Sequence, residues 1–440
     1  MTTASASLAH LLRRSGFGAT AAEMTAAEQA GYAATAERLL AGLGAPDHGA
    51  AAIATPTFAP LPTDLGQLRS DPSARKSFTQ QLALEHRQLV AWWLARMVAT
   101  TNPLAEKLTF LLHGHFPTAI SKVRFPQFMY GQNELFRTQG AGAFDALTQA
   151  VAVDPAMLIW LDASSDKASD PNENFARELM ERFTMGIGTY TEDDVRAASY
   201  AFTGWRLDRL TGEFTIDQQE HSPAPQTFLG VPGVSTGQQV IDIVTHSGAS
   251  ARFVPAAFWS HLATPVTVDD PVVDDLTAAY HPDLDVTSLL RAIFSHPDFT
   301  SPGVTGGLVK QPVEYVVGAL RAFGVDGTAL ASRPDGVLEV LTGLGQLLFD
   351  PPSVGGWGQN EYWLSTAAAL TRWQFAGRLT TLVDLSPVAD AAPNARVDAV
   401  AELLAVDTWS TATAEALRRA GGDPTLLVTL ALVSPEYVSN

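Results

Sequence analysis

Apolar residues recur at the spacing of an α-helix along almost the whole chain, and this periodicity constrains the fold more than any other feature. Between residues 77 and 100, leucine, valine, tryptophan and methionine return every three or four positions, as in a helix with one face in a core. The same pattern covers residues 21–43, 143–151, 175–185, 192–202, 240–245, 250–263, 271–280, 286–294, 312–324, 337–347, 363–382, 397–405, 414–420 and 424–433. The sequence predicts a mainly α protein, a single large multi-helical globular domain over residues 1–440.

Two helix starts are marked by capping residues. Thr191 precedes three acidic residues, and a hydroxyl cap followed by acids suits the positive end of a helix. Pro103 follows Asn102, which places a proline at the first helical position. We expect the helix that starts at Pro103 to end near His113, with Gly114 as the residue that follows its last turn.

Three stretches lack the helical pattern. Residues 44–75 are rich in glycine, proline and aspartate and predict a long surface excursion, and residues 350–362 form a proline and glycine loop. Residues 206–237 contain short extended segments at 213–217 and 226–229. We expect a small irregular or β-hairpin excursion there.

Composition excludes several classes of function. The net charge is −18, and no cluster of lysine and arginine reverses it locally, so nucleic acid and anionic membranes are not expected partners. No apolar run reaches the roughly 18 to 20 residues that span a bilayer. Residues 1–9 form a Thr/Ser/Ala tract without the long apolar region of a leader, so the chain as written is expected in the cytoplasm. Because there is no cysteine, any metal must be held by histidine or oxygen ligands.

His113 and His115 open the densest group of polar residues. In a helix their side chains would point about 200° apart. If the helix ends near His113, the two imidazoles can converge. The alternative is that His113 caps the negative end of the helix while His115 is an ordinary buried residue.

A second group lies on the helix predicted at 175–185. Asn174, Arg177, Glu178 and Glu181 share one helical face opposite an apolar stripe. Either these side chains form a site, or they are a solvated face with exposed ion pairs worth about 0.3 to 0.5 kcal/mol each. His221, on the non-helical stretch, is placed to reach across a cleft or is simply exposed.

Several of these motifs recur together in one family. They are residues 11–18, 113–116, 172–181, 190–195, 201–205, His221 with 228–230, 309–314 and 351–357. The chain resembles the bacterial domain-of-unknown-function family numbered 1800 over nearly its whole length. The resemblance implies a predominantly helical domain, export in many relatives and a sulfatase-like partner encoded nearby. The family carries no agreed activity.

Two functions fit these residues. The first is a metal-dependent or acid–base hydrolase with a His/His/Glu centre. His113, His115, Glu178 and His221 would be ligands for zinc, manganese or iron, and Glu178, His115 and Asn174 would be catalytic. The alternative is a non-catalytic helical scaffold or accessory protein, working with a sulfatase-like partner, in which the same side chains form a buried network.

Overall fold

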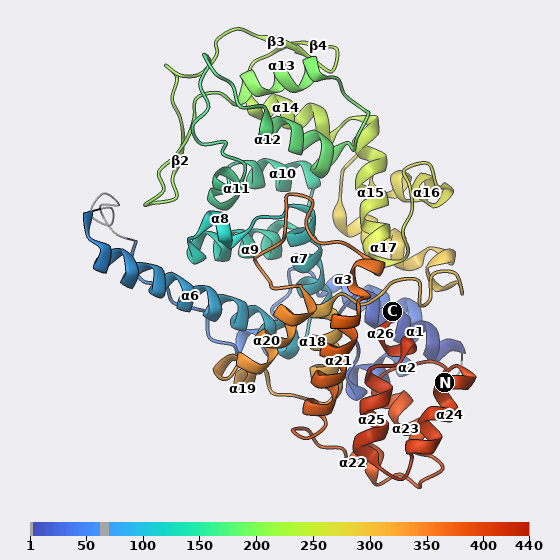
Figure 1. Ribbon diagram of the computed structural model, residues 1–440. Helices are drawn as coiled ribbons and strands as arrows, with labels where there is room; N and C mark the ends of the chain where they lie inside the picture. Colours follow the sequence, from blue (N-terminus) through green and yellow to red (C-terminus); the bar gives the residue numbers. More distant parts are fainter. Residues whose placement is uncertain (1–2, 62–69, 440) are drawn as a thin grey trace.

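The computed structural model describes residues 3–61 and 70–439, and helices dominate it (Figure 1). The prediction of a mainly α fold is confirmed. The first third of the chain contains α1 (Thr3–Arg14), α2 (Ala21–Ala30), α3 (Tyr32–Ala41), α4 (His48–Ala51), α6 (Pro72–Ala99), α7 (Pro103–His115), α8 (Ile120–Val123), α9 (Pro126–Gln139), α10 (Phe144–Ala152) and α11 (Pro155–Trp160).

The middle third carries the strands of the described residues. It contains α12 (Glu173–Glu178), the π-helix η1 (Leu179–Thr184), α13 (Glu192–Phe202), β1 (Trp205–Leu207), β2 (Phe214–Ile216), β3 (Gln226–Phe228), β4 (Val231–Val234), α14 (Gly237–Thr245), α15 (Gly248–Leu262), α16 (Pro271–Tyr280) and α17 (Val286–Ser295). β1 pairs with β2 and β3 with β4, each pair antiparallel. These two hairpins confirm the excursion predicted near 206–237.

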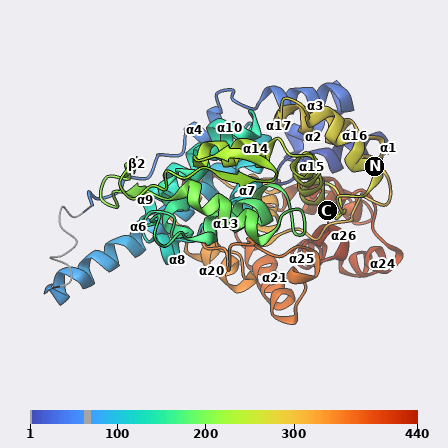
Figure 2. The ribbon, with the colours of Figure 1, turned by 90° about the horizontal axis from the view of Figure 1, so that it is seen from above.

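The last third begins with the 3₁₀ helix η2 (Pro297–Thr300) and continues through α18 (Pro312–Ala322), α19 (Gly327–Ser332), α20 (Asp335–Leu344), η3 (Asn360–Trp363), α21 (Thr366–Leu379), α22 (Ser386–Ala389), α23 (Arg396–Leu403), α24 (Thr411–Ala420), α25 (Pro424–Leu432) and α26 (Pro435–Val438). In Figure 1, α12 to α14 and the hairpins lie at one end of the molecule and α22 to α25 at the other. The start of α6 projects from the body in both Figure 1 and Figure 2.

Two predicted segments differ from the structure. The helix predicted at 21–43 is broken at Gly31, whose φ of 83° is a left-handed conformation that ends α2 and starts α3. The excursion predicted at 44–75 holds α4, and α6 begins within it at Pro72. The rest of that excursion, residues 62–69, lies outside the described residues. No helix of residues 3–61 or 70–439 is both long and apolar enough to cross a membrane.

Helix α7 lies between the two hydrophobic cores. Leu104, Leu108 and Leu112 belong to one core, together with α1 to α3 and α10 to α17. Phe110 belongs to the other, which is built mainly from α6, α9 and the helices from α18 onward. Because both sides of α7 are covered, its polar side chains are buried as well, and each needs a partner inside the protein.

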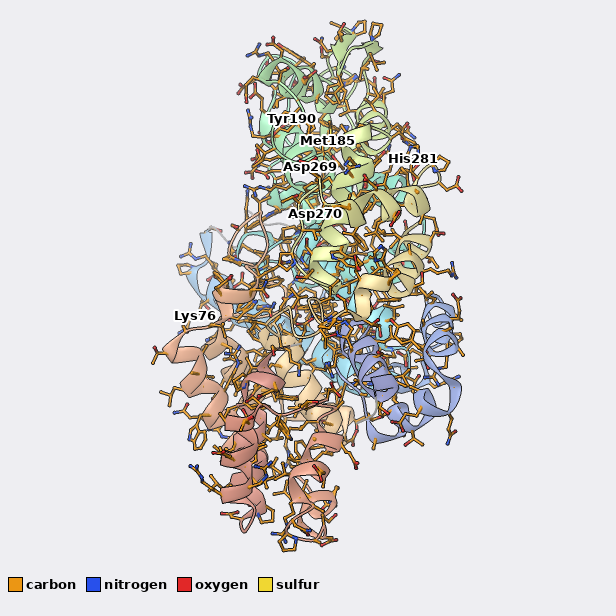
Figure 3. The ribbon with its side chains drawn as sticks, turned by 90° about the vertical axis from the view of Figure 1, so that its right-hand side faces the viewer. Lys76, Met185, Tyr190, Asp269, Asp270 and His281 are labelled. Atoms are coloured by element: carbon orange, nitrogen blue, oxygen red, sulfur yellow. The ribbon has the colours of Figure 1, made fainter. Side chains whose placement is uncertain are left out.

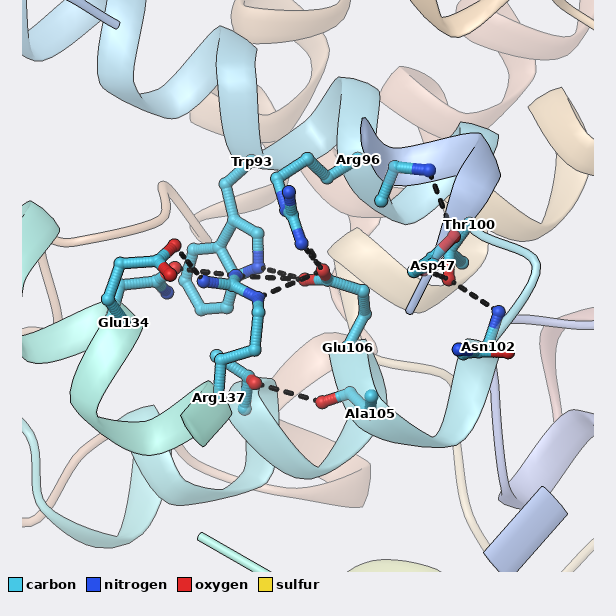
Figure 4. Close-up of polar contacts among 12 residues, drawn as sticks. Asp47, Trp93, Arg96, Thr100, Asn102, Ala105, Glu106, Glu134 and Arg137 are labelled. Atoms are coloured by element: carbon cyan, nitrogen blue, oxygen red, sulfur yellow. Dashed lines mark hydrogen bonds and ion pairs between the residues drawn. The ribbon is translucent and has the colours of Figure 1, made fainter. Parts of the chain in front are cut away.

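Glu106 shows how α7 satisfies this requirement (Figure 4). Its carboxylate, 1% exposed, accepts hydrogen bonds from Trp93 Nε1 at 2.9 Å and from the guanidinium groups of Arg96 and Arg137 at 3.0 Å. Burial alone would raise the pKa of Glu106, but Arg137 and Arg96 hold it below its usual value. The start of α7 is thereby fixed to α6 and α9.

Candidate active site

A cavity of about 590 Å³ lies beside the end of α7. Five stretches of chain that are far apart in sequence line it: α7, η1 with the turn after it, α15, the residue before α18, and the loop between α20 and η3. The lining residues are Phe110, Leu111, Gly114, His115, Glu181, Arg182, Gly186, Ile187, Phe253, Ala257, His261, Gln311, Val354, Gly355, Trp357, Gly358 and Gln359. Polar groups on its wall include two imidazoles, a carboxylate, a guanidinium and two amides.

Two glycines shape one wall of this cavity. A Cβ on Gly114 would meet no atom within 4 Å, whereas a Cβ on Gly356 would lie 2.6 Å from the carbonyl oxygen of Gly114. Gly356, with φ of 71°, therefore lets its loop pack directly on α7. The prediction that α7 ends near His113 was wrong. The helix continues through Gly114 to His115, and the missing side chain of Gly114 leaves room in the cavity.

His115 lies on the wall formed by α7. Its Nε2 is 2.8 Å from the carbonyl oxygen of Phe183, so Nε2 carries the proton and donates, and Nδ1 is the acceptor. The ring also packs against Phe144 and Phe253. Burial lowers the pKa of His115 to about 4. The imidazole is therefore neutral at pH 7.

His261, in the last turn of α15, faces the same cavity. Its Nδ1 donates to the carbonyl oxygen of Ala257, one turn earlier, at 2.8 Å. Burial lowers the pKa of His261, and the effects of Glu314 and Lys107 on it oppose each other. The Nε2 atom of a neutral imidazole in this tautomer is a proton acceptor.

A π-helical turn brings a charged pair to the cavity. The helix that starts at Glu173 changes from α to π geometry after Glu178, and such turns are frequent at functional sites. The predicted shared α-helical face therefore ends at Glu178. Glu181 and Arg182 follow in the π turn, line the cavity and form an ion pair of 3.2 Å.

Tyr190 supports this pair from outside the turn. Its hydroxyl donates to Glu181 Oε2 at 3.0 Å. Figure 3 labels Tyr190 and Met185, which both lie in the segment that joins η1 to α13. Burial and the bond to Glu181 raise the pKa of Tyr190 to about 12, so the phenol remains a donor at neutral pH.

Glu178 lies next to this group but is not among the residues that line the cavity. Its side chain is 14% exposed, and its Oε2 lies 4.0 Å from Arg182 Nε. Burial, followed by the charge of Glu181, raises the pKa of Glu178. From this position the carboxyl group of Glu178 interacts electrostatically with the charges of Glu181 and Arg182.

His113 points away from the cavity, as expected for a residue two positions before His115 in a continuous helix. Its ring packs against Trp93, Phe349 and Trp357. The backbone N–H of Phe349 donates to His113 Nε2 at 3.1 Å. Burial lowers the pKa of His113 to about 3.

The other two predicted site residues bond to the main chain elsewhere. Asn174 donates to the carbonyl oxygen of Leu161 at 3.2 Å, which ties the start of α12 to the end of α11. His221 lies in the segment between β2 and β3, and its Nδ1 is 2.8 Å from the carbonyl oxygen of Thr203. Neither residue lines the cavity.

The predicted metal ligands do not form a cluster. Within residues 3–61 and 70–439, no three histidine, aspartate or glutamate side chains are grouped so that they could hold a metal ion. The continuous helix separates His113 from His115, and His221 is bonded to Thr203. The structure therefore gives the proposed His/His/Glu/His ligand set no support.

A family model matches residues 10–439 of the chain. The chain belongs to the family described as "Protein of unknown function (DUF1800)". The resemblance seen in the sequence motifs is confirmed. No curated protein and no solved structure matches this DUF1800 protein.

Several residues that line the cavity of this DUF1800 protein had no role assigned from the sequence, among them Gln311, Trp357 and His261. Gln311 and Trp357 lie in motifs at 309–314 and 351–357 that carried the family resemblance without an assigned role. His261 lies in no such motif. Its only local signal is its place on the helix predicted at 250–263, and the approach of α15 to α7 is a tertiary contact that no local pattern encodes.

Proposed function

We propose that the cavity is the active site of a hydrolase that acts on a small molecule by acid–base catalysis, with His261 as the general base. The observation that carries this proposal is the presence of two neutral imidazoles, His115 and His261, on the wall of one cavity. A volume of about 590 Å³ suits a small-molecule ligand.

The tautomers support this assignment of roles. With Nδ1 bonded to Ala257, His261 accepts a proton from water at Nε2. The water oxygen then bonds to the electrophilic centre of the substrate, the bond to the leaving group breaks, and His261 returns the proton to that group. His115, held by Phe183, stays neutral because burial disfavours its charged form and because a protonated His261 would repel that charge.

Hydrolysis of four p-nitrophenyl substrates, the acetate, butyrate, phosphate and sulfate, tests the proposal. We expect turnover of at least one above the buffer rate, and a loss of about 100-fold or more in His261→Gln, in line with the usual contribution of a general base. Gly114→Val, whose new side chain enters the cavity, should raise KM. Turnover of none of the four, or equal turnover by His261→Gln, would refute the proposal.

His246→Gln is the matched control. His246 is exposed, and its Nδ1 lies 2.9 Å from the carbonyl oxygen of Asp242, the same four-residue spacing that joins His261 to Ala257. The control should keep wild-type activity. The assay is repeated with EDTA and with added Zn²⁺, Mn²⁺ or Fe²⁺. Turnover that requires a metal and Glu178 would support the metal-dependent form of the hydrolase instead.

A second candidate is a non-catalytic scaffold or accessory protein that works with a sulfatase-like partner. The bonds of His113, Asn174 and His221 to main-chain atoms favour it, because such bonds stabilise a fold without chemistry. On this hypothesis His261→Gln changes stability and no reaction rate.

A further inference from the structure

A small hollow adjoins the cavity on the side of α18. It has a volume of about 10 Å³, which is room for about one water molecule. Its lining residues are Ser260, His261, Leu308, Val309, Gln311, Glu314, Gln359 and Asn360. It shares His261, Gln311 and Gln359 with the cavity, so the two spaces adjoin at these side chains.

Glu314 supplies a buried carboxylate to this hollow. Its Oε1 pairs with the ammonium group of Lys107 on α7, and its Oε2 accepts the backbone N–H of Gln311 at 2.8 Å. Burial alone would raise the pKa of Glu314, but Lys107, the Gln311 bond and Arg14 hold it below its usual value. A carboxylate has about four acceptor positions, and these two bonds leave capacity for a further donor.

The remaining groups complete a set of partners for one water. His261 has its Nε2 acceptor because Nδ1 is bonded to Ala257. Gln346 donates to Gln311 Oε1 at 2.6 Å, so the amide nitrogen of Gln311 is the donor of that side chain. Two acceptors and one donor are what a buried water needs, since such waters make about three hydrogen bonds.

We infer that the hollow holds the nucleophilic water of the reaction, which donates one hydrogen bond to His261 and the other to Glu314. This inference rests on the proposed hydrolase function. The water proton that is hydrogen-bonded to His261 moves to Nε2, and the water oxygen bonds to the electrophilic centre of the substrate in the adjoining cavity. The bond to the leaving group then breaks, and that group takes the proton from His261. Glu314 stays unprotonated and is a positioning residue, because it orients the water and does not touch the substrate.

This placement explains why residues of distant motifs meet here. The segments 11–18 and 309–314 contribute Arg14, Lys310 and Glu314, and Lys107 comes from α7. Lys310 is 5% exposed, and its Nζ atom lies 3.6 Å from the centre of the Tyr437 ring. Burial lowers the pKa of Lys310 well below its usual value. The charges of Lys107 and Arg14 favour the ionised, accepting form of Glu314.

The first test does not depend on turnover. A high-resolution crystal structure of the wild-type protein should show one water within hydrogen-bond distance of His261 Nε2 and of a Glu314 oxygen. A hollow that is empty or filled by a side chain would overturn the inference, whatever the activity. If the water is present and no ester is hydrolysed, the proposed function fails while the water site stands.

The second test separates positioning from stability. Glu314→Gln alone would leave Lys107 buried without its partner, so the variant is Lys107→Met with Glu314→Gln. We expect a folded protein whose kcat is lower by about 10-fold to 100-fold, with KM within about twofold of wild type, as for a residue that orients the nucleophile. An unchanged kcat in the folded double variant would overturn the role of Glu314.

Glu23→Gln is the control for the second test. It removes the carboxylate of another ion pair, between Glu23 and the buried Arg321, and neither residue lines the cavity or the hollow. Its kcat should equal that of the wild type. In the double variant, histidine NMR should show a change at His261 and none at His246.

Discussion

Replacing His113 by glutamine should reduce the acid sensitivity of the protein. The imidazole is 2% exposed and burial lowers its pKa to about 3, whereas an unfolded histidine titrates near 6.5. On unfolding below pH 6.5, the ring takes up a proton that the folded state refuses. The stability that His113 contributes is therefore complete above pH 6.5 and is lost as the pH falls towards its folded pKa.

The magnitude follows from the two pKa values. At pH 5, about 1.5 pH units below the pKa of an unfolded histidine, protonation of this residue stabilises the unfolded state by about 2 kcal/mol. Glutamine keeps an acceptor for the N–H of Phe349 and does not titrate. We expect His113→Gln to cost about 1 to 3 kcal/mol at pH 7.5 through lost ring packing. Between pH 7.5 and 5, its stability should fall by about 2 kcal/mol less than that of the wild type.

Urea unfolding followed by tryptophan fluorescence at the two pH values measures this difference. His48→Gln is the control, because His48 is exposed and is in water in the folded and unfolded states alike. Its pH dependence should match that of the wild type. If His113→Gln loses as much stability as the wild type between pH 7.5 and 5, the reasoning from burial is refuted.

Three further changes probe the fold. Glu106→Gln removes the buried charge that Trp93 and the partly buried Arg96 and Arg137 share. We expect a loss of about 3 to 5 kcal/mol in guanidinium unfolding, and a loss below about 1 kcal/mol would contradict the network. In thermal unfolding, Gly356→Ala should lower stability by at least about 1 to 3 kcal/mol, because φ at this position is positive and the new Cβ would meet the Gly114 carbonyl oxygen. Gly355→Ala is the control: its φ is outside that region, so its loss in the same assay should be smaller. Thr191→Ala removes the capping bond of α13 and should lower the free energy of unfolding by about 1 kcal/mol. An unchanged midpoint in urea unfolding would contradict this expectation.

The sequence predicted elements whose signals are local. Helix α13 spans the predicted residues 192–202, and Thr191 caps it, because the cap, the acidic turn and the apolar stripe all lie within a dozen residues. The start of α7 at Pro103 is confirmed for the same reason. Strands β2 and β3 lie in the predicted extended segments 213–217 and 226–229, but they pair with β1 and β4, which were not predicted, and not with each other.

Features that depend on tertiary packing were missed. A glycine after a histidine has the pattern of a helix end, yet α7 continues through Gly114 to His115, and the loop that carries Gly356 packs against this turn. The π turn after Glu178 changes which acids face the cavity, and the 3.6-residue period used for the sequence assumes a uniform helix. The candidate site was therefore predicted only in part: His115 lines the cavity, and its neighbours there come from distant segments.

Helix α7 contributes side chains to both hydrophobic cores, and this has a consequence for how the chain can be divided. If the chain were expressed as two fragments, each would display an apolar surface that the other normally covers, and neither would be stable alone. Mixing the fragments would be expected to restore one complex through α7, so the protein should tolerate a nick in a surface loop far better than the loss of either half.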